Sequence, residues 1–178
     1  MPNNSTFLVL TAIGDDRPGL VGELSALISA HHGNWLESSM SQLGGKFAGI
    51  VKVEIATQRA ETLKAALDGL AGLKVTAEIS SPQTPAAGAG RRMQLSLVGH
   101  DRIGIVREVT QTLAHHAVNV EKLVTFISSA AMSAESLFNA QAILHVAADL
   151  DTRALIAELE TISDDLMVDL TIEDTPGA

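Results

Sequence analysis

The sequence predicts an α+β protein built from two copies of one small domain, each with a four-stranded antiparallel sheet and two helices on one face. The motif Gly-x-Asp-Arg-x-Gly follows an apolar run at residues 14–19 and again at residues 99–104. In both halves the patterns run strand, helix, strand, strand, helix, strand, which is the order of a ferredoxin-like βαββαβ unit. We expect one domain at residues 5–80, a Pro-, Gly- and Ala-rich linker at 81–92, and a second domain at 93–174.

The repeat is supported by a gap-free alignment of the two halves that sets Asp16 against Asp101. Residues 14–34 and 99–119 then share a set of identical residues. The pairs are Gly14/Gly99, Asp16/Asp101, Arg17/Arg102, Gly19/Gly104, Val21/Val106, Glu23/Glu108, His31/His116 and Asn34/Asn119. Identities at one constant offset indicate a duplicated domain.

In the first half, Phe7–Ile13 is an aliphatic run that predicts a strand. Apolar residues at helical spacing follow, and Gly33 is expected to end that helix; they are Leu20, Val21, Leu24, Leu27 and Ile28. Two strands, Trp35–Leu43 and Phe47–Ala56, flank the turn signal Gly44-Gly45. Thr57 is expected to cap a second helix that buries Leu63, Leu67 and Leu70, and Lys74–Ile79 is the last strand.

The second half repeats this order. The predicted strands are Gln94–Val98, Val118–Ile127, Phe138–Ala147 and Met167–Ile172. Ile105, Val106, Val109 and Leu113 mark the first helix; Leu155, Ile156, Leu159 and Ile162 mark the second. Asp151 or Thr152 is expected to cap the second helix. The hairpin connection, Ser128–Ser136, is longer than its counterpart and is expected to be mobile.

Composition excludes several classes of protein. The chain of 178 residues has 12 basic and 21 acidic residues, a net charge of -9, so its surface does not suit nucleic acid or an anionic membrane. It has no cysteine, hence no disulfide and no thiolate nucleophile. We find neither a signal-peptide pattern nor an apolar run of about 18 residues, and we expect a soluble cytoplasmic protein.

The repeated loop has the properties of a small-anion site. The first glycine frees the chain as it leaves the strand, and Asp16 or Asp101 is expected to accept hydrogen bonds from the N–H groups that open the helix. Gly19 and Gly104 leave room for a small molecule to reach the backbone, and a helix N-terminus attracts a carboxylate. The alternative is a plain capped turn, with Arg17 and Arg102 paired to Glu23 and Glu108.

The remaining motifs predict neither a metal nor a catalytic site. The pairs His31-His32 and His115-His116 end the first helix of each repeat, where positive charge is favourable, and no carboxylate or further histidine falls at close ligand spacing. His145 is expected to be structural, and Trp35 is expected to pack in the core or at an interface. Because the sequence does not assemble a nucleophile, a base and an orienting group, we expect no enzyme and no cofactor.

At these residues the sequence resembles a known family. GDDRPGLVGEL in the first half and GHDRIGIVREV in the second, each followed by a His-x-x-Asn step, resemble the ACT domain, a small ligand-sensing module of amino-acid metabolism. Two such domains alone resemble the glycine cleavage system transcriptional repressor family. That resemblance implies a repressor that senses glycine and acts on a transcriptional activator protein by protein–protein contact, without direct DNA binding.

The resemblance also implies which residues bind the ligand, since ACT ligands commonly sit between this loop and the second strand of a neighbouring unit. Carried over to this sequence, the first site is Gly14, Asp15, Asp16, Arg17, Pro18, Gly19 and Leu20, with Asn34 nearby. The second is Gly99, His100, Asp101, Arg102, Ile103, Gly104 and Ile105, with Asn119 nearby. Ile103 replaces Pro18, so the second loop loses a restraint on φ and is expected to bind more weakly.

Two further hypotheses remain open at this point. The chain could be a regulatory amino-acid-sensing subunit of a metabolic enzyme, which co-purification with an enzyme would reveal. It could also be a small enzyme, although no residue pattern supplies a reaction. A homodimer is plausible under any of the hypotheses, because ACT sheets often pair with one another.

Overall fold

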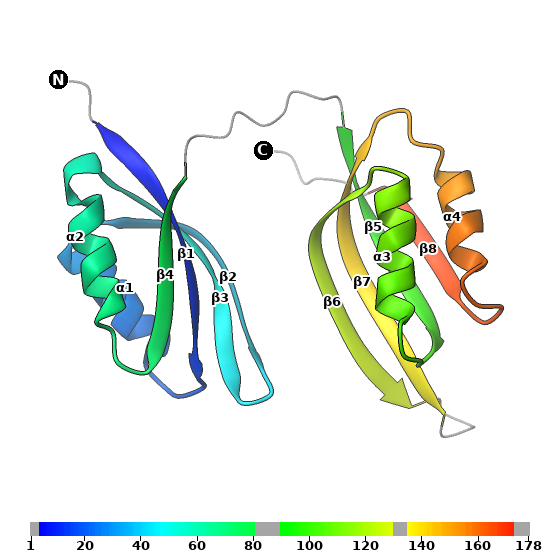
Figure 1. Cartoon of the computed structure of the whole chain (residues 1–178), viewed down its shortest axis with the longest axis horizontal. Coiled ribbons are helices and arrows are strands. Elements are labelled where there is room, and N and C mark those ends of the chain that lie inside the picture. The colour runs from blue at the N-terminus through cyan, green and yellow to red at the C-terminus, as the bar shows by residue number, and fades with distance from the viewer. Residues whose placement is uncertain (1–3, 81–89, 130–134, 173–178) are drawn as a thin grey trace. The chain divides into compact units, whose positions relative to one another are not determined.

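The computed structural model describes residues 4–80, 90–129 and 135–172, which form two compact domains (Figure 1). The first contains β1 (Ser5–Asp15), α1 (Leu20–Ala30), β2 (Asn34–Leu43), β3 (Lys46–Ala56), α2 (Thr57–Asp68) and β4 (Leu73–Ser80). The second contains β5 (Gly90–His100), α3 (Ile105–His115), β6 (Asn119–Ser129), β7 (Ser136–Ala147), α4 (Thr152–Glu160) and β8 (Met167–Ile172). Both halves therefore have the predicted βαββαβ order, and the fold class is confirmed.

Each domain has one antiparallel sheet with the first strand of the repeat near its centre. The strand orders are β2-β3-β1-β4 and β6-β7-β5-β8. β1 pairs with β3 from Ser5↔Ala56 to Asp15↔Lys46, and β5 pairs with β7 over the matching length. Both helices of a domain cover the same face of its sheet (Figure 1).

Burial alternates along the central strands because successive side chains point to opposite faces. In the first domain the buried set is Leu8, Leu10 and Ala12 on β1 and Val51, Val53 and Ile55 on β3, facing Leu20, Leu24 and Ile28 of α1 and Ala60, Leu63 and Leu67 of α2. Trp35 is half-buried against this cluster, as the prediction of core packing requires. A separate cluster fills the second domain. Each half therefore has its own core.

The structure corrects two local predictions and confirms a third. Thr57 does not cap α2: it is the first helical residue, and its hydroxyl donates to the carbonyl of Asn4 at 2.8 Å. Asp151 does cap α4, since its carboxylate accepts from the N–H groups of Arg153 (3.0 Å) and Ala154 (3.1 Å). α4 ends at Glu160, so Ile162 lies beyond the helix and packs against the core from the following turn.

The predicted linker extends too far into the second domain. Gly90, Arg91 and Arg92 belong to β5 and pair with Ala147, Val146 and His145. The paired strand supplies the order that the local sequence does not indicate. Residues 81–89 lie outside the described residues, and so do residues 130–134 of the hairpin connection expected to be mobile.

Within the described residues, no helix is both long enough and apolar enough to cross a membrane.

Candidate functional site

The repeated loop joins the first strand of each domain to its first helix through a left-handed glycine. Gly19 has φ 95° and Gly104 has φ 94°, and each is the residue immediately before its helix. An L-residue with a side chain is strained in this region, so the second glycine of the motif is required by the backbone. The two loops therefore turn in the same way, as the repeat predicts.

Asp16 and Asp101 do not cap their helices, which corrects the prediction. Neither α1 nor α3 has a side-chain cap. In each loop the glycine three residues later occupies the capping position. The aspartates take part in the turn through their backbone: the N–H of Asp16 donates to the carbonyl of Gly45, and the N–H of Asp101 donates to the carbonyl of Ser136, both at 2.9 Å. Both aspartate side chains are exposed. Among the described residues, no side chain accepts from the first-turn N–H groups, and no ion pair is formed by Asp16 or Asp101.

The two arginines of the repeated motif form ion pairs with a glutamate in the first turn of the following helix. Arg17 binds Glu23 through both guanidinium nitrogens at 2.7 Å, and Arg102 binds Glu108 at 3.0 and 2.5 Å. The hydrogen bonds from Arg17 lower the pKa of Glu23, and those from Arg102 lower the pKa of Glu108. This is the pairing expected under the plain-turn alternative, and it holds each guanidinium across the first turn of its helix.

A cavity of about 130 Å³ lies at the first loop. Its lining consists of Asp16, Arg17, Gly19, Leu20, Val21, Gly22 and Phe47. A water needs roughly 10–15 Å³ on the same kind of measure, so the space accommodates several non-hydrogen atoms. Four of the predicted first-site residues meet here, whereas Gly14, Asp15 and Pro18 are not part of the lining. Asp15 is instead paired with Lys46, whose hydrogen bond lowers the pKa of its carboxyl group.

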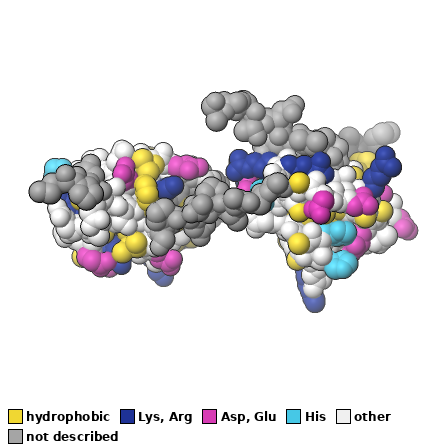
Figure 2. Space-filling view, turned by 90° about the horizontal axis from the view of Figure 1, so that it is seen from above, with side chains coloured by type: hydrophobic (Ala, Val, Ile, Leu, Met, Phe, Trp, Pro, Cys, Tyr) yellow, Lys and Arg dark blue, Asp and Glu magenta, His cyan; other side chains and the backbone are white. Residues whose placement is uncertain are grey.

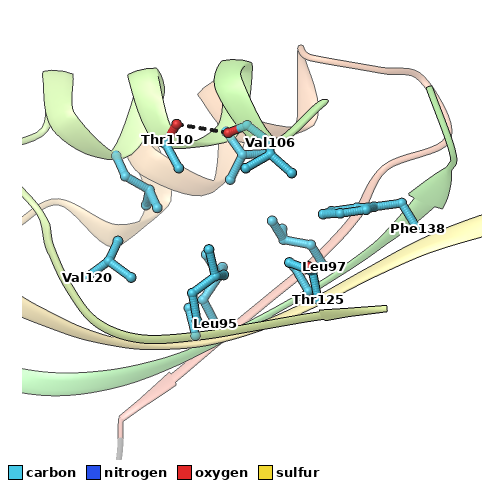
Figure 3. A pocket seen from close by; sticks show the side chains of 12 residues that line it. Leu95, Leu97, Val106, Thr110, Val120, Thr125 and Phe138 are labelled. Carbon is cyan, nitrogen blue, oxygen red and sulfur yellow. Dashed lines mark hydrogen bonds between the residues drawn. The ribbon is translucent and has the colours of Figure 1, made fainter. Parts of the chain in front are cut away.

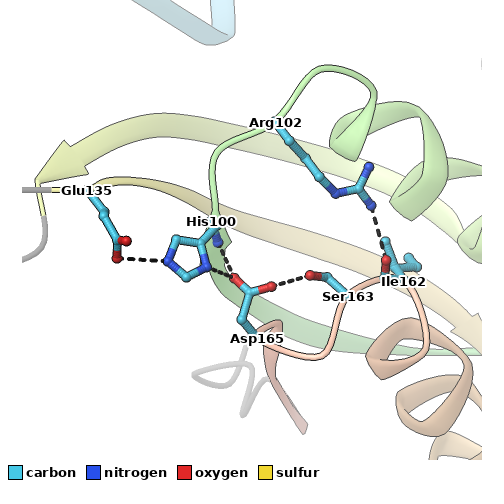
Figure 4. A network of polar contacts seen from close by, with 6 residues as sticks. All are labelled: His100, Arg102, Glu135, Ile162, Ser163 and Asp165. Carbon is cyan, nitrogen blue, oxygen red and sulfur yellow. Dashed lines mark hydrogen bonds and ion pairs between the residues drawn. The ribbon is translucent and has the colours of Figure 1, made fainter. Parts of the chain in front are cut away.

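The second loop is tied to the segment between α4 and β8 (Figure 4). The carboxylate of Asp165 accepts from the backbone N–H of His100 at 2.5 Å and contacts its Nδ1 at 2.6 Å. The other ring nitrogen lies 3.0 Å from Glu135, and the pKa of His100 is raised, first by the hydrogen bond to Glu135. A hydrogen bond from Ser163, together with the one from the His100 backbone, lowers the pKa of Asp165 to about 2. Arg102 also donates to the carbonyl of Ile162 at 3.1 Å.

The first loop has no side chain where the second has Asp165. On the last strand of the first domain, Gly14 pairs with Leu73, and the residue before Leu73 is Gly72. In the second domain the equivalent Gly99 lies opposite Leu166, one residue beyond the pair Val98↔Met167, and the residue before Leu166 is Asp165. Gly72 instead leaves room for Arg17, whose guanidinium would lie 3.6 Å from a Cβ at that position. The two loops thus have the same backbone conformation but differ in the side chains that contact them.

Asn34 and Asn119 lie far from the loop of their own domain. Asn34 pairs with Glu54, which faces Phe7 on β1, eight residues before the loop begins at Asp15. At about 3.3 Å per residue the separation along the sheet is roughly 26 Å. Asn34 instead lines a different cavity with His32 and Glu54, and Asn119 pairs with His145 at the corresponding end of the second sheet. The structure does not unite these asparagines with the loop residues of the same domain.

An apolar pocket lies between α3 and the sheet of the second domain (Figure 3). Residues such as Leu97, Val106 and Phe138 line it, and several belong to the core. Its volume is only about 20 Å³, close to that of a single water. This space is therefore a packing gap, and too small to hold an amino acid.

A carboxylate that is distant in the sequence contacts the second histidine pair, although no carboxylate lies near this pair in the sequence. Glu158 on α4 lies 3.2 Å from His115 and 2.8 Å from His116. Sequence spacing did not reveal this group because 42 residues separate His116 from Glu158. The predicted order of elements places α3 and α4 on the same face of the sheet, and this could have suggested that Glu158 lies near the two histidines.

Comparison with known proteins finds a family that is similar to the first domain. The model of the ACT domain family matches residues 6–78. A crystal structure of an unknown protein from Galdieria sulphuraria is similar over 95% of this chain and 99% of its own, with 26% identity and a TM-score of 0.83. A crystal structure of a candidate glycine cleavage system transcriptional repressor is similar over 96% of this chain and 99% of its own, with 20% identity and a TM-score of 0.65, which shows a shared fold.

No curated protein matches the sequence significantly. The family match covers the first domain, and the second domain repeats its strand order, its left-handed glycine and its loop motif. The first domain of this chain therefore matches the ACT domain family, and the second domain repeats the same fold.

Proposed function

We propose that this ACT-domain protein is an amino-acid-responsive regulator that binds a small amino acid at its first loop and acts through protein–protein contact. The observation that carries the proposal is the cavity at residues 16–22. There an uncapped helix N-terminus and an exposed carboxylate stand together. These groups have the charges needed to bind both ends of an amino-acid zwitterion.

The two charged ends of such a ligand would be recognised separately. The N–H groups at the start of α1 would donate to the carboxylate, with the helix dipole favouring negative charge. The free carboxylate of Asp16 would accept from the ammonium group as a charge-assisted hydrogen bond. Arg17 is held by Glu23, so its guanidinium frames the cavity rather than competing for Asp16.

The cavity favours a ligand with a small side chain. Gly19 and Gly22 leave one side of it without side chains, while Leu20, Val21 and Phe47 give apolar walls. A volume of about 130 Å³ suits glycine or another small amino acid better than an aromatic one. Glycine is the ligand implied by the resemblance to the repressor family.

The contacts of the second loop make the first loop the better candidate. In the second domain the carboxylate of Asp165 already accepts the N–H of His100, and the first helical N–H, of Ile105, donates to Arg102 at 3.4 Å. The second loop is thus tied to the segment before β8, and one N–H at the start of its helix already has a backbone acceptor. We propose one main amino-acid site per chain, with the second loop in a structural role.

We further propose that the regulated process is the glycine cleavage system, with a cytoplasmic transcriptional activator protein as the partner. The similar crystal structure named as a candidate repressor supports this choice, together with the sequence resemblance. A chain of net charge -9 is electrostatically suited to a basic partner such as a DNA-binding protein, and unsuited to DNA itself. Each sheet also has one face without helices, and we propose that a protein partner contacts one of these faces (Figure 1).

Calorimetry on the full chain tests the ligand site, with glycine first and the other amino acids as a panel. The matched variants are Asp16→Asn and Asp101→Asn, which change the same position of each repeat and preserve side-chain size. Loss of a hydrogen bond to a charged group should weaken binding by about 10- to 100-fold in Asp16→Asn. Asp101→Asn should bind as the wild type does. Absence of binding by any amino acid, or equal loss in both variants, would overturn the site.

The proposed output needs a separate measurement. A mobility-shift assay on glycine cleavage operator DNA should show no shift with this protein alone, and a glycine-dependent change when the activator is present. Capture of a metabolic enzyme in place of the activator would favour the alternative of a regulatory enzyme subunit. Direct binding to the DNA at physiological salt would refute action through protein contact.

A further inference from the structure

A cluster of three potential metal ligands, His115, His116 and Glu158, lies on the second domain away from the repeated loops. Nδ1 of His115 is 3.2 Å from one carboxylate oxygen of Glu158, and Nε2 of His116 is 2.8 Å from the other. One ligand atom from each residue lies within 4.8 Å of the others. Figure 2 shows histidine side chains beside acidic ones on the surface of this domain.

Two consecutive histidines at the end of α3 contact the same carboxylate. His115 is the last helical residue and His116 is the C-cap, with φ -85° and ψ 11°. Ala117 then takes a left-handed conformation, with φ 54°. The turn is closed by the N–H of Val118 donating to Leu113 at 2.9 Å. The two rings meet edge to face, with centroids 5.3 Å apart.

The third ligand is held from the other helix. Glu158 lies on α4, directly before Leu159, which is completely buried. The start of α4 is fixed by the Asp151 cap, and both helices pack on the same sheet. The carboxylate is therefore presented to the histidines by a rigid element. His115 is 73% exposed, which leaves the cluster open to solvent.

We propose that His115, His116 and Glu158 bind a divalent transition-metal ion, with Zn²⁺ as the best fit, and leave at least one coordination position open. Zn²⁺ binds imidazole nitrogen and carboxylate oxygen at about 2.0–2.2 Å, so ligand atoms around a tetrahedral ion lie roughly 3.4 Å apart. The 2.8 and 3.2 Å contacts go to the two different carboxylate oxygens, and one ligand atom from each residue lies within 4.8 Å of the others, so the three side chains must converge slightly to hold the ion. Two imidazoles disfavour Mg²⁺ and Ca²⁺, which prefer oxygen ligands.

The first domain provides a natural comparison. His31 is the repeat equivalent of His116, and His32 follows it, so this domain also has a histidine pair at the end of its first helix. Among the described residues, the three-ligand group on the second domain is the only one of its kind. Within the described residues the first-domain pair forms no three-ligand group, so it should bind the ion much more weakly.

The test is calorimetric titration of the full chain, free of any histidine tag, with Zn²⁺ alone. We expect one site per chain that His116→Ala and Glu158→Gln each weaken by about 10-fold or more. The control is the double variant His31→Ala/His32→Ala, which should bind as the wild type does. His115→Ala, at an exposed position, provides a third ligand variant that does not disturb the core. Titration with Co²⁺ should give visible absorption bands that the same ligand variants abolish.

The outcomes separate cleanly. Loss of the site in the three ligand variants with retention in the control supports the proposal. No saturable Zn²⁺ binding, or binding that survives Glu158→Gln and His116→Ala, overturns it. Circular dichroism of each variant shows whether a loss comes from unfolding, and Glu158→Gln preserves the shape of the side chain. Glycine binding at the first loop is an independent result and does not enter this test.

Discussion

Replacing Gly19 by alanine should destabilise the first domain through its backbone alone. The residue has φ 95°, a left-handed conformation that costs an L-residue about 1–2 kcal/mol. Space is not the obstacle, because a Cβ at Gly19 would meet only the carboxylate of Glu23 at 3.7 Å, an ordinary contact. The change in unfolding free energy is therefore expected to equal the conformational strain. For a domain of this size it corresponds to a fall in melting temperature of roughly 4–16 °C.

The single tryptophan makes this prediction measurable in one domain. Trp35 is half-buried against the first core, so its fluorescence reports unfolding of that domain. Gly19→Ala should lower the midpoint seen by fluorescence. The matched variant Gly104→Ala, where φ is 94°, should leave that midpoint unchanged and lower the second-domain transition seen by circular dichroism.

Gly22→Ala is the control of opposite sign. Gly22 lies inside α1, and a Cβ there would meet nothing within 4 Å. Alanine should stabilise the helix by about 0.5–1 kcal/mol. A Gly19→Ala variant as stable as the wild type would refute the assignment of Gly19 to a left-handed turn. A destabilising Gly22→Ala would refute the placement of that residue in an open helix interior.

Two further predictions concern the second domain. The pKa of Asp165 is lowered from 3.8 to about 2 in the folded state, so on acidification the unfolded state takes up the proton first. The stability that the ionised Asp165 contributes is therefore present above about pH 4 and is lost as the pH falls to about 2. Asp165→Asn should flatten that acid limb in urea unfolding followed by circular dichroism, and an unchanged limb would contradict the hydrogen bonds from Ser163 and the His100 backbone. Asp151→Ala should cost about 0.5–2 kcal/mol because it removes the cap of α4. The same assay checks this, and a loss of zero would show that the cap is not formed in solution.

The order of elements was predictable because apolar periodicity determines which face of each strand and helix is buried. Leu8, Leu10 and Ala12 alternate on a strand, and Leu20, Leu24 and Ile28 recur at helical spacing. Two copies of the same order also restricted the topology. The start of β5 was missed, since Gly90–Arg92 are ordered by pairing with β7 and lack an apolar pattern of their own.

The site was less predictable because it depends on which ends of elements meet. A strand–helix–strand crossover returns the chain to the starting end of the first strand, so Asn34 follows α1 at the end of the sheet opposite the loop. That argument was available from the order of elements alone. The filling of the second loop was not, because the contact of His100 with Asp165 joins residues 65 apart and depends on side-chain direction. Capping by Asp16 failed for a backbone reason, since the glycine at position 19 occupies the cap.

Both domains have an irregularity at the same place on an outer strand. The register shifts between Trp35 and Glu37 on β2, and between Val120 and Lys122 on β6. β2 and β6 are edge strands, and an open edge is a template for uncontrolled addition of strands from other chains. A bulge twists the edge and interrupts its regular row of hydrogen-bonding groups. Any second chain that extends these sheets must therefore align beyond the bulge, which limits growth into fibrils and favours pairing in one defined register.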